Sequence, residues 1–296
     1  MGEQGNSAAA SGFLGKVRLT LAMIKFEHSV FALPFALTGA MLARRGLPSW
    51  RELFWIVVAM VGARSAAMTF NRIADFKIDA LNPRTRTRAL PAGQLTLGFA
   101  VAFTVASCAL LAFAAWELNP LAFKLSPVAM AILLGYSFTK RFTVLSHLIL
   151  GLCLGMSPAA AWIALRGDLS ASMLLLGAAV MLWVAGFDII YACQDVEFDH
   201  SLGLHSIPRR YGIRAALGVS ALLHFGTLAL LVAVMRVENL GWIAGAGLAA
   251  VAALLAYEHS LVKPSDLSRV NAAFFTVNGF ISILFFLTWA ADLLGH

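Results

Sequence analysis

Residues 170–199 read SASMLLLGAAVMLWVAGFDIIYACQDVEFD and combine an apolar run with an acidic end. From Ser170 to Phe187 no side chain carries a charge, and a run of this length predicts a helix that crosses a lipid bilayer. From Asp188 onward, several carboxylates follow. Carboxylates at the ends of membrane helices are costly and usually functional. The stretch therefore predicts a membrane helix that ends in a functional site.

The composition of the whole chain extends this interpretation. Of its 296 residues, 60% are hydrophobic and 12% are charged, and the mean hydropathy is +0.82. A soluble domain contains about half apolar and about a quarter charged residues. No soluble fold could bury this excess, which excludes a soluble enzyme, a disordered chain and a nucleic-acid-binding domain. At about 20 residues per membrane helix, the chain has room for about eight to ten. We predict an all-α polytopic membrane protein.

Apolar runs separated by charged or Pro/Gly-containing segments predict nine membrane helices. They lie at residues 18–43, 51–74, 95–116, 121–138, 143–165, 170–192, 212–235, 240–260 and 270–293. Residues 1–15 are rich in Gly, Ser and Ala and lack the basic start of a signal peptide. We predict a disordered tail over 1–15 and a single transmembrane domain over 16–296.

The charged connections predict the orientation in the membrane. Residues 75–94 and 195–212 are long and charged, and both follow even-numbered helices, so both lie on the same side. Most of the 22 lysine and arginine residues fall on that side, and this bias accounts for most of the net charge of +7. By the positive-inside rule this side is cytoplasmic. We expect a multi-pass protein of the cell inner membrane whose functional loops face the cytoplasm.

Polar residues with matching spacing lie at the ends of two predicted helices. At the end of the second helix, residues four apart share one face: Asn71, Asp75 and Asp79. At the end of the sixth helix, one face carries Asp188, Tyr191, Asp195 and Asp199. An interval of 120 residues separates the two Asp-x-x-x-Asp pairs, which indicates an internal duplication. The two pairs are therefore expected to face each other over one cytoplasmic mouth.

Carboxylates that face each other at short range repel, so this arrangement requires a cation. Hard oxygen ligands without cysteine or histidine favour Mg²⁺, which binds a few carboxylates together with phosphate oxygens. Basic and aromatic residues share the mouth: Arg84, Arg86, Arg88, Tyr136, Lys140 and Arg141, with Lys25 of the first predicted helix as a further candidate. Acidic, basic and metal groups at one site are typical of diphosphate binding, because guanidinium groups hold the oxygens that the metal leaves free.

Taken together, these motifs resemble the UbiA superfamily of intramembrane aromatic prenyltransferases. They are NxxxDxxxD at 71–79, PRTRTRALPAG at 83–93, YSFTKR at 136–141 and DxxYAxxDxxxD at 188–199. The resemblance implies nine helices around a central cavity, two Mg²⁺ ions, a polyprenyl diphosphate donor and an aromatic acceptor. It implies that the metal ligands are Asn71, Asp75, Asp79, Asp195 and Asp199, with these four aspartates and Arg64 as the catalytic residues. Two positions depart from the pattern: Arg72 stands where many members have Asp, and His205 where many have Lys.

Arg64 lies two helical turns before Asn71 on the same face. An unpaired guanidinium at this depth is costly, so we expect Arg64 to point into the cavity and meet an anion or Asp188. The resemblance implies that this anion is a carboxylate on the aromatic acceptor. Tyr136, Asp188 and Tyr191 are further candidates for acceptor binding.

The segments KFEHSVFALPFAL at 25–37 and GLHSIP at 203–208 are similar to bacterial quinone-pathway members of this superfamily. The expected acceptor is 4-hydroxybenzoate, with a dihydroxynaphthoate precursor of menaquinone as the alternative. Haem farnesyltransferase and chlorophyll synthase activities stay open within the family. From another class, a secondary transporter predicts broken helices and ionisable residues at mid-membrane, whereas the charges here gather at one mouth. A phospholipid-headgroup transferase predicts a DG-x-x-A-R run, which the sequence lacks.

Overall fold

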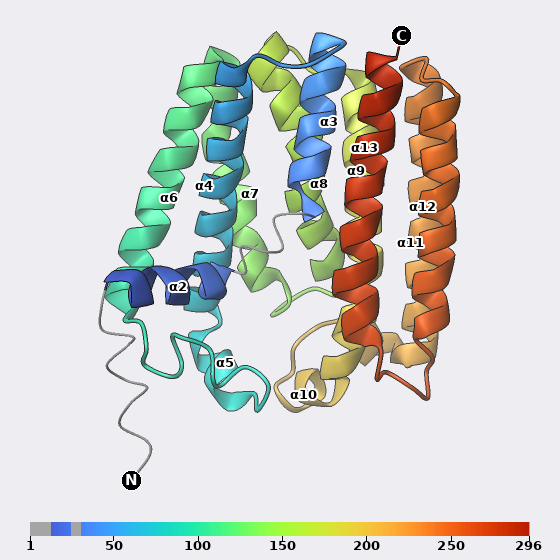
Figure 1. Cartoon of the computed structure of the whole chain (residues 1–296). Coiled ribbons are helices and arrows are strands. Elements are labelled where there is room, and N and C mark those ends of the chain that lie inside the picture. Colours follow the sequence, from blue (N-terminus) through green and yellow to red (C-terminus); the bar gives the residue numbers. More distant parts are fainter. Residues whose placement is uncertain (1–12, 25–30, 296) are drawn as a thin grey trace.

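The computed structural model describes residues 13–24 and 31–295, and within these the chain is almost entirely helical (Figure 1). Among the described residues, eight helical segments are long and apolar enough to cross a membrane. They are α4 (Trp50–Ala74), α6 (Leu97–Leu118), α7 (Pro120–Thr139), α8 (Ser146–Arg166), α9 with its extension (Ala171–Ser201), α11 (Ile207–Val237), α12 (Trp242–Leu261) and η3 with α13 (Ala272–Leu294). The predicted all-α, multi-pass fold is confirmed.

From the second predicted helix to the ninth, hydropathy placed each helix close to its observed position. The largest difference is at α11, which begins at Ile207 rather than at residue 212. Gly212 has a φ of 81° and a ψ of 159°, which are not helical values. Such a positive φ suits glycine, so a kink at Gly212 separates a short first turn from the long membrane-crossing part of α11.

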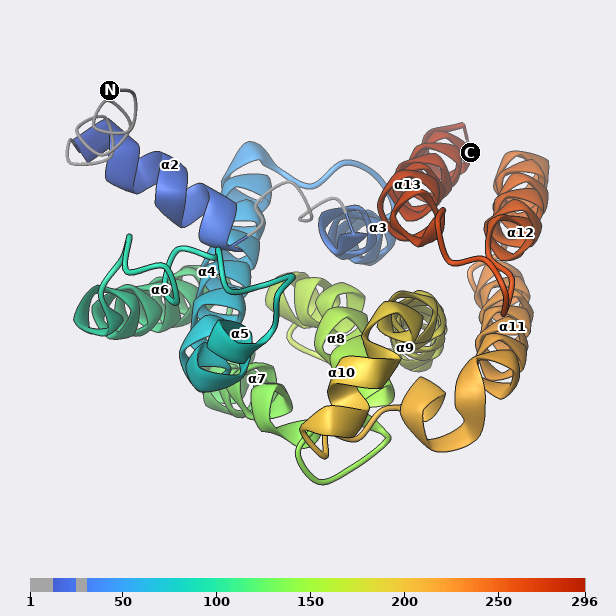
Figure 2. The same ribbon diagram turned by 90° about the horizontal axis from the view of Figure 1, so that it is seen from below.

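The prediction of one continuous helix over residues 18–43 is wrong. This region contains α2 (Phe13–Ile24) and α3 (Leu33–Arg44), and residues 25–30 between them lie outside the described residues. α2 lies across the axis of the bundle, whereas α3 runs along it (Figures 1 and 2). Pro34 stands in the first turn of α3, where proline is tolerated at the start of a helix but not in its interior. The apolar composition of this region concealed that change of direction.

The predicted tail over residues 1–15 is only partly covered by the structure. Residues 1–12 lie outside the described residues. α2 begins at Phe13, so the last three positions assigned to the tail are helical.

Polar side chains at the helix starts explain why short connections suffice between neighbouring helices. At the start of α4, Ser49 Oγ accepts a bond from the Glu52 N–H, and Glu52 Oε2 accepts one from the Ser49 N–H. This reciprocal capping box satisfies two N–H groups that the helix itself leaves unpaired. Thr96, Asn119 and Ser170 cap α6, α7 and α9 with their side chains in a similar way.

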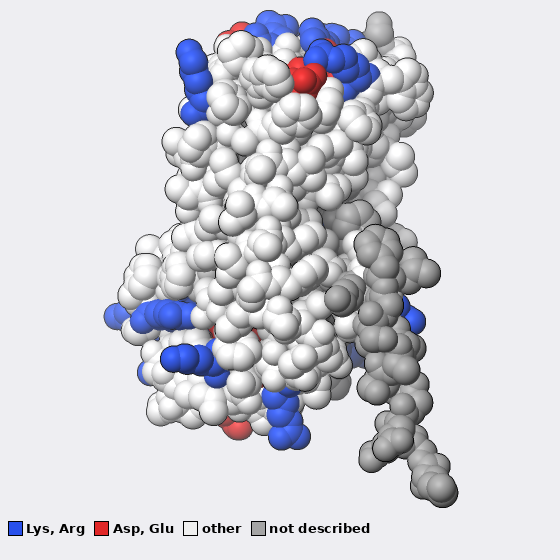
Figure 3. Space-filling model, turned by 90° about the vertical axis from the view of Figure 1, so that its left-hand side faces the viewer, with Lys and Arg blue, Asp and Glu red and all other residues white. Residues whose placement is uncertain are grey.

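The outer surface has the pattern expected of a protein surrounded by lipid. Figure 3 shows a broad belt without charged side chains between two charged bands. At the end of the bundle opposite the acidic motifs, Trp50 is 87% exposed and Trp242 is 80% exposed. Tryptophan is enriched where a membrane meets water, so these residues mark one edge of the bilayer.

Two parts of the chain repeat the same construction 120 residues apart. α4 is followed by a six-residue helix, α5 (Phe76–Leu81), and α9 by the short turn η2 (Cys193–Asp195) and a six-residue helix, α10 (Val196–Ser201). Asp75 and Asp195 are the junction residues, with φ and ψ of −92° and 4° and of −104° and 8°. The same backbone conformation at equivalent positions supports the predicted internal duplication.

The largest buried cluster surrounds α9. Trp183 of α9 packs on Phe35 of α3 at a ring separation of 5.2 Å, and Phe35 packs on Phe285 of α13 at 4.9 Å. Dense packing of this kind restricts movement of the helix axis. It therefore fixes the position of the acidic end of α9.

Candidate active site

A cavity of about 600 Å³ is lined by residues of α5 and α10 together with residues of the membrane helices. The volume lies within the range of about 300–1,000 Å³ typical of small-molecule sites. Most of the predicted site residues line it: Arg64, Asn71, Asp75, Asp79, Arg84, Arg88, Tyr136, Lys140, Asp188, Tyr191, Asp195 and Asp199. The two acidic motifs, far apart in sequence, therefore share one space.

The first acidic pair, Asp75 and Asp79, is buried and neutralised by basic side chains. Lys140 Nζ lies 2.5 Å from Asp75 Oδ2. Arg88 Nη1 donates to both oxygens of Asp79 at 2.8 Å, and Arg72 Nη1 lies 3.7 Å from Asp79 Oδ2. The helical bonding continues through the junction, because the Asp79 N–H donates to the Asp75 carbonyl at 2.7 Å. The four-residue spacing thus keeps both carboxylates on one side, as the sequence predicted.

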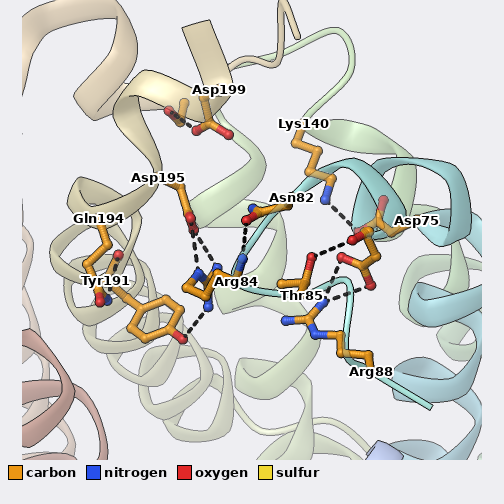
Figure 4. A network of polar contacts seen from close by, with 12 residues as sticks. Asp75, Asn82, Arg84, Thr85, Arg88, Lys140, Tyr191, Gln194, Asp195 and Asp199 are labelled. Atoms are coloured by element: carbon orange, nitrogen blue, oxygen red, sulfur yellow. Dashed lines mark hydrogen bonds and ion pairs between the residues drawn. The ribbon is translucent and has the colours of Figure 1, made fainter. Parts of the chain in front are cut away.

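The second pair, Asp195 and Asp199, has its own polar partners. Arg84 donates to both oxygens of Asp195, through Nε at 3.2 Å and Nη2 at 2.6 Å, and to the Tyr191 hydroxyl at 2.9 Å (Figure 4). Burial opposes the charge of Arg84, but the attraction of Asp195 and Tyr191 outweighs it and raises the pKa of the guanidinium. The Ser206 hydroxyl donates to Asp199 Oδ2 at 2.8 Å. Arg84, which lies in the loop after α5, thus connects the first half of the chain to the acidic motif of the second half.

These acidic residues fit divalent ions bound together with a diphosphate. The buried Oδ1 of Asp75 has no hydrogen-bond partner, and such an oxygen is costly to bury unless a cation binds it. In the part of the chain that the structure describes, no three metal-binding side chains gather around one point. Each ion would therefore bind one acidic pair and take its other ligands from phosphate oxygens and water, as Mg²⁺ usually does.

Three predicted diphosphate ligands stand apart from the others. Arg86 is exposed and is not among the residues that line the cavity, so its prediction as a ligand is not supported. Backbone bonds of the helical type run from Arg86 to Asn82 and from Arg88 to Thr85. In such turns, residues four apart lie on the same side, and the residue midway between them faces the other way. Arg84 and Arg88 therefore reach the cavity, whereas Arg86 does not. 

Arg141 reaches the first acidic pair from outside the cavity lining. Its Nη2 lies 3.8 Å from Asp75 Oδ1 and also donates to the Ala74 carbonyl. Lys25, the third of these ligands, lies outside the described residues.

The cavity continues inward to polar groups between apolar walls. Arg64 lines this part, as predicted. Asp188 pairs with His147, whose Nδ1 lies 2.6 Å from Asp188 Oδ2. The other ring nitrogen of His147 accepts the Ile207 N–H at 3.4 Å, which assigns the proton to Nδ1 and makes it the donor to Asp188.

Sequence reasoning missed several functional neighbours. His147 belongs to no motif, because it lies 41 residues away in sequence from Asp188, the carboxylate that it contacts. Ser206 lies within the GLHSIP segment, but its bond to Asp199 was not predicted. Arg72 was noted only as a departure from the family pattern, yet it is 8% exposed and close to Asp79. The sequence did contain a signal for Arg72, since it stands where many members of the family have an acidic residue. His205 lines the cavity, and its buried Nδ1 has no hydrogen-bond partner.

Comparison with known proteins agrees with this geometry. Residues 32–287 match the model of the UbiA prenyltransferase family. The 4-hydroxybenzoate octaprenyltransferase of Nitrosospira multiformis is 34% identical over 239 residues, which cover 80% of this chain and 82% of that protein. The protein of the same name from Thiobacillus denitrificans is 34% identical over 235 residues, or 79% of each chain.

Solved structures show the same fold. The apo structure of a UbiA homolog from Aeropyrum pernix K1 is 38% identical with a TM-score of 0.82, covering 90% of this chain and 98% of that one. A UbiA homolog from Archaeoglobus fulgidus, solved with GPP and Mg²⁺ bound, is 20% identical with a TM-score of 0.75. That alignment covers 93% of this chain and 99% of the other. At 20% identity the likeness concerns the fold alone.

Proposed function

This chain belongs to the UbiA prenyltransferase family, and from that premise we propose that it transfers a polyprenyl group from a polyprenyl diphosphate to an aromatic acid, 4-hydroxybenzoate, with the help of Mg²⁺. One observation carries the proposal: two equivalent acidic pairs share one cavity with basic side chains that a diphosphate can also bind. The names of the relatives support 4-hydroxybenzoate as the acceptor, and the ligands of the Archaeoglobus homolog support the donor class and the metal.

The acidic pairs are the proposed metal ligands. Asn71, Asp75 and Asp79 would hold one Mg²⁺, and Asp195 and Asp199 the other. Bound there, the ions supply Lewis-acid stabilisation of the diphosphate when its allylic C–O bond breaks.

The basic residues bind and orient the diphosphate in this proposal. Arg84, Arg88 and Lys140 each pair with a carboxylate that the metal ions would also neutralise. Their N–H groups then become available to phosphate oxygens, for which guanidinium forks are well suited. The negative charge of the leaving diphosphate is greater in the transition state than in the bound donor. Positive groups already held in place therefore accelerate the reaction as well as binding the donor.

The inner part of the cavity is the proposed acceptor site. The acceptor ring attacks the allylic carbon, a C–C bond forms, the diphosphate leaves, and the attacked ring carbon loses a proton. In this proposal Arg64 pairs with the acceptor carboxylate, and Tyr136, Asp188 and Tyr191 contact its hydroxyl. The proposal is supported by the position of all four residues in the cavity lining. Apolar walls exclude water, which otherwise intercepts the allylic cation.

The orientation of the site completes the proposal. The acidic mouth carries the loops that the positive-inside rule assigns to the cytoplasm. The diphosphate of the donor and the carboxylate of the acceptor are both charged and soluble in water. A mouth that opens to the cytoplasm can therefore receive both. The polyprenyl tail then extends into the lipid.

The direct test uses the purified full-length chain with a labelled polyprenyl diphosphate, Mg²⁺ and separate aromatic acids. We expect a prenylated product by mass with 4-hydroxybenzoate, and none when EDTA removes the metal. Readdition of Mg²⁺ should restore the product. A product with 1,4-dihydroxy-2-naphthoate alone would move the acceptor to the menaquinone precursor. The absence of product with every acceptor contradicts the proposed function.

A further inference from the structure

The last membrane segment begins with an unusual helical turn. Residues Ala272–Val277 form a π-helix, η3, before the regular α-helix α13 (Asn278–Leu294). π-turns are rare, occur mostly as single turns within α-helices and are frequent at functional sites. The sequence AAFFTV contains neither proline nor glycine to cause the distortion. Its cause is therefore to be sought in contacts with other helices.

Asn278 supplies those contacts through its side-chain amide. Nδ2 donates to the carbonyl of Ala273 at 3.0 Å and lies 3.3 Å from the carbonyl of Phe274, both within the π-turn. The same nitrogen donates to Glu258 Oε1 of α12 at 2.8 Å, and Oδ1 accepts from Trp183 Nε1 of α9 at 2.8 Å. One side chain thus connects the π-turn to two other helices.

The chemistry of the partners fixes the orientation of this amide. Trp183 Nε1 can only donate, so it faces Oδ1, and the carboxylate oxygen of Glu258 is an acceptor for Nδ2. All three side chains are buried, with Asn278 and Glu258 0% exposed and Trp183 1% exposed. In an apolar interior, losing one partner leaves the others unsatisfied, so the three act as one unit.

The π-turn presents two aromatic side chains to the cavity. Phe274 and Phe275 both line it, although they are successive residues. A π-turn contains more residues than an α-turn, so successive side chains are separated by a smaller angle and can face the same side. The Phe274 ring lies 4.3 Å from the Tyr191 ring and 5.1 Å from the Phe187 ring, and Phe275 lies 5.9 Å from Tyr191.

Tyr191 joins these rings to the diphosphate site. Its hydroxyl accepts a hydrogen bond from Arg84, which also binds Asp195. The aromatic wall and the charged mouth therefore meet at one residue. An isoprenoid whose diphosphate lies at the mouth has its first carbons beside these rings.

We infer that Asn278 is a positioning residue for prenyl transfer: its amide holds the π-turn that places Phe274 and Phe275 beside Tyr191. The inference rests on the proposed function. It goes beyond that function because Asn278 touches neither donor nor acceptor and does not line the cavity. Its effect is to keep the aromatic wall closed around the reacting end of the donor.

This role predicts a specific defect. Without the amide, the π-turn relaxes toward an α-turn, the two phenylalanine rings rotate, and water reaches the allylic carbon. Water then adds to that carbon as diphosphate leaves and a proton is released, which yields a prenyl alcohol. The ligands of the diphosphate stay in place, so donor binding changes little while transfer gives way to hydrolysis.

The experiment measures the prenylated product and the prenyl alcohol from the same reaction. For Asn278→Ala in the full-length protein we expect kcat for transfer to fall about tenfold or more, since small displacements of reacting groups have large effects. The donor KM should stay within about twofold, and the ratio of alcohol to product should rise several-fold. Ser220→Ala is the matched control. Ser220 is 0% exposed, and its hydroxyl donates from α11 to the Gly186 carbonyl of α9 at 2.8 Å. Neither residue lines the cavity.

Trp183→Phe is the second variant, in case Asn278→Ala does not fold. It keeps an aromatic ring in the core but removes the indole N–H that donates to Asn278 Oδ1, together with part of the ring volume. The amide of Asn278 keeps its other bonds, so we expect the same change in product ratio, but a smaller one. The inference is overturned if transfer and hydrolysis fall in equal proportion, or if the variants behave like Ser220→Ala. In either case, normal prenyl transfer by the wild-type chain still supports the proposed function. If the wild-type chain transfers no prenyl group to any acceptor, the proposed function itself is rejected.

Discussion

At the scale of single residues, the two oxygens of the Asp75 carboxylate have different surroundings. Oδ2 accepts from Lys140, whereas Oδ1 is buried without a hydrogen bond. A native protein rarely buries such an oxygen without a use for it. Asp75 is therefore the residue at which the metal proposal is tested most directly.

We expect Asp75→Ala to lower prenyl transfer about 10³-fold or more, because a metal ligand is lost at the leaving diphosphate. The melting temperature should change little, since the variant also removes an unsatisfied buried oxygen. Activity at saturating Mg²⁺ and thermal unfolding are the two measurements. Glu117→Ala is the control, because Glu117 pairs with Arg51 at 3.0 Å at the other end of the bundle. A wild-type rate for Asp75→Ala contradicts the metal assignment.

Arg64 is the corresponding test of the acceptor site. If its guanidinium pairs with the acceptor carboxylate, Arg64→Ala leaves that anion buried without its partner, at a cost of about 3–5 kcal/mol. Acceptor turnover should then fall by about two to four decades. Donor affinity should be nearly unchanged, and Arg64→Lys should recover only part of the activity because it lacks the guanidinium fork. Separate titrations of donor and acceptor measure this, and loss of donor affinity alone would move Arg64 to the diphosphate site.

At the scale of helices, the sequence predicted what depends on local composition and spacing. α4 and α9 were located because their apolar runs end in acidic motifs, and the four-residue spacing correctly placed each aspartate pair on one side. The change of direction between α2 and α3 was missed, since both helices have an apolar composition and composition does not show in which direction a helix runs. The π-turn was missed for a different reason: its carbonyls are held by Asn278, and Asn278 is held by two distant helices.

The start of α12 shows how one helix can depend on another. It has no side-chain cap of its own, but Asp292 of α13 accepts from the N–H groups of Gly241 at 2.6 Å, Ile243 at 3.1 Å and Ala244 at 3.2 Å. Asp292 is 1% exposed, so water cannot replace it. Its negative charge also interacts favourably with the N-terminal end of the helix dipole.

Asp292→Ala should accordingly lower the free energy of unfolding by about 2–4 kcal/mol, because three backbone N–H groups lose their buried acceptor. Asp292→Asn retains one acceptor oxygen and should lose less. Unfolding in detergent micelles measures both variants, and Asp266→Ala, on the exposed connection before η3, serves as the control. Equal stability of Asp292→Ala and Asp266→Ala argues against a capping role.

At the scale of the whole molecule, the apolar belt and the two charged ends specify how the bundle lies in a membrane. Leu47, between α3 and α4, is 69% exposed at the end that carries Trp50. Thr87 is exposed in the loop after α5, at the acidic end. These two positions therefore report on opposite sides of the bilayer.

With Cys108 replaced by Ser, the remaining native cysteines, Cys153 and Cys193, are buried. A membrane-impermeant maleimide should then label Leu47→Cys in intact cells. Thr87→Cys should be labelled only in inside-out vesicles, because the positive-inside rule assigns the acidic mouth to the cytoplasm. The opposite labelling pattern contradicts this orientation.

The repeated junctions at Asp75 and Asp195 have a consequence for how such a molecule can change over evolutionary time. Within each pair, the distance between carboxylates follows from helix pitch and is insensitive to substitutions elsewhere. The distance between the pairs follows instead from how the two halves of the chain pack together. Substitutions where the two halves pack together can thus change the distance between the acidic pairs that a bridging ligand must span. The spacing of the carboxylates within each pair stays the same.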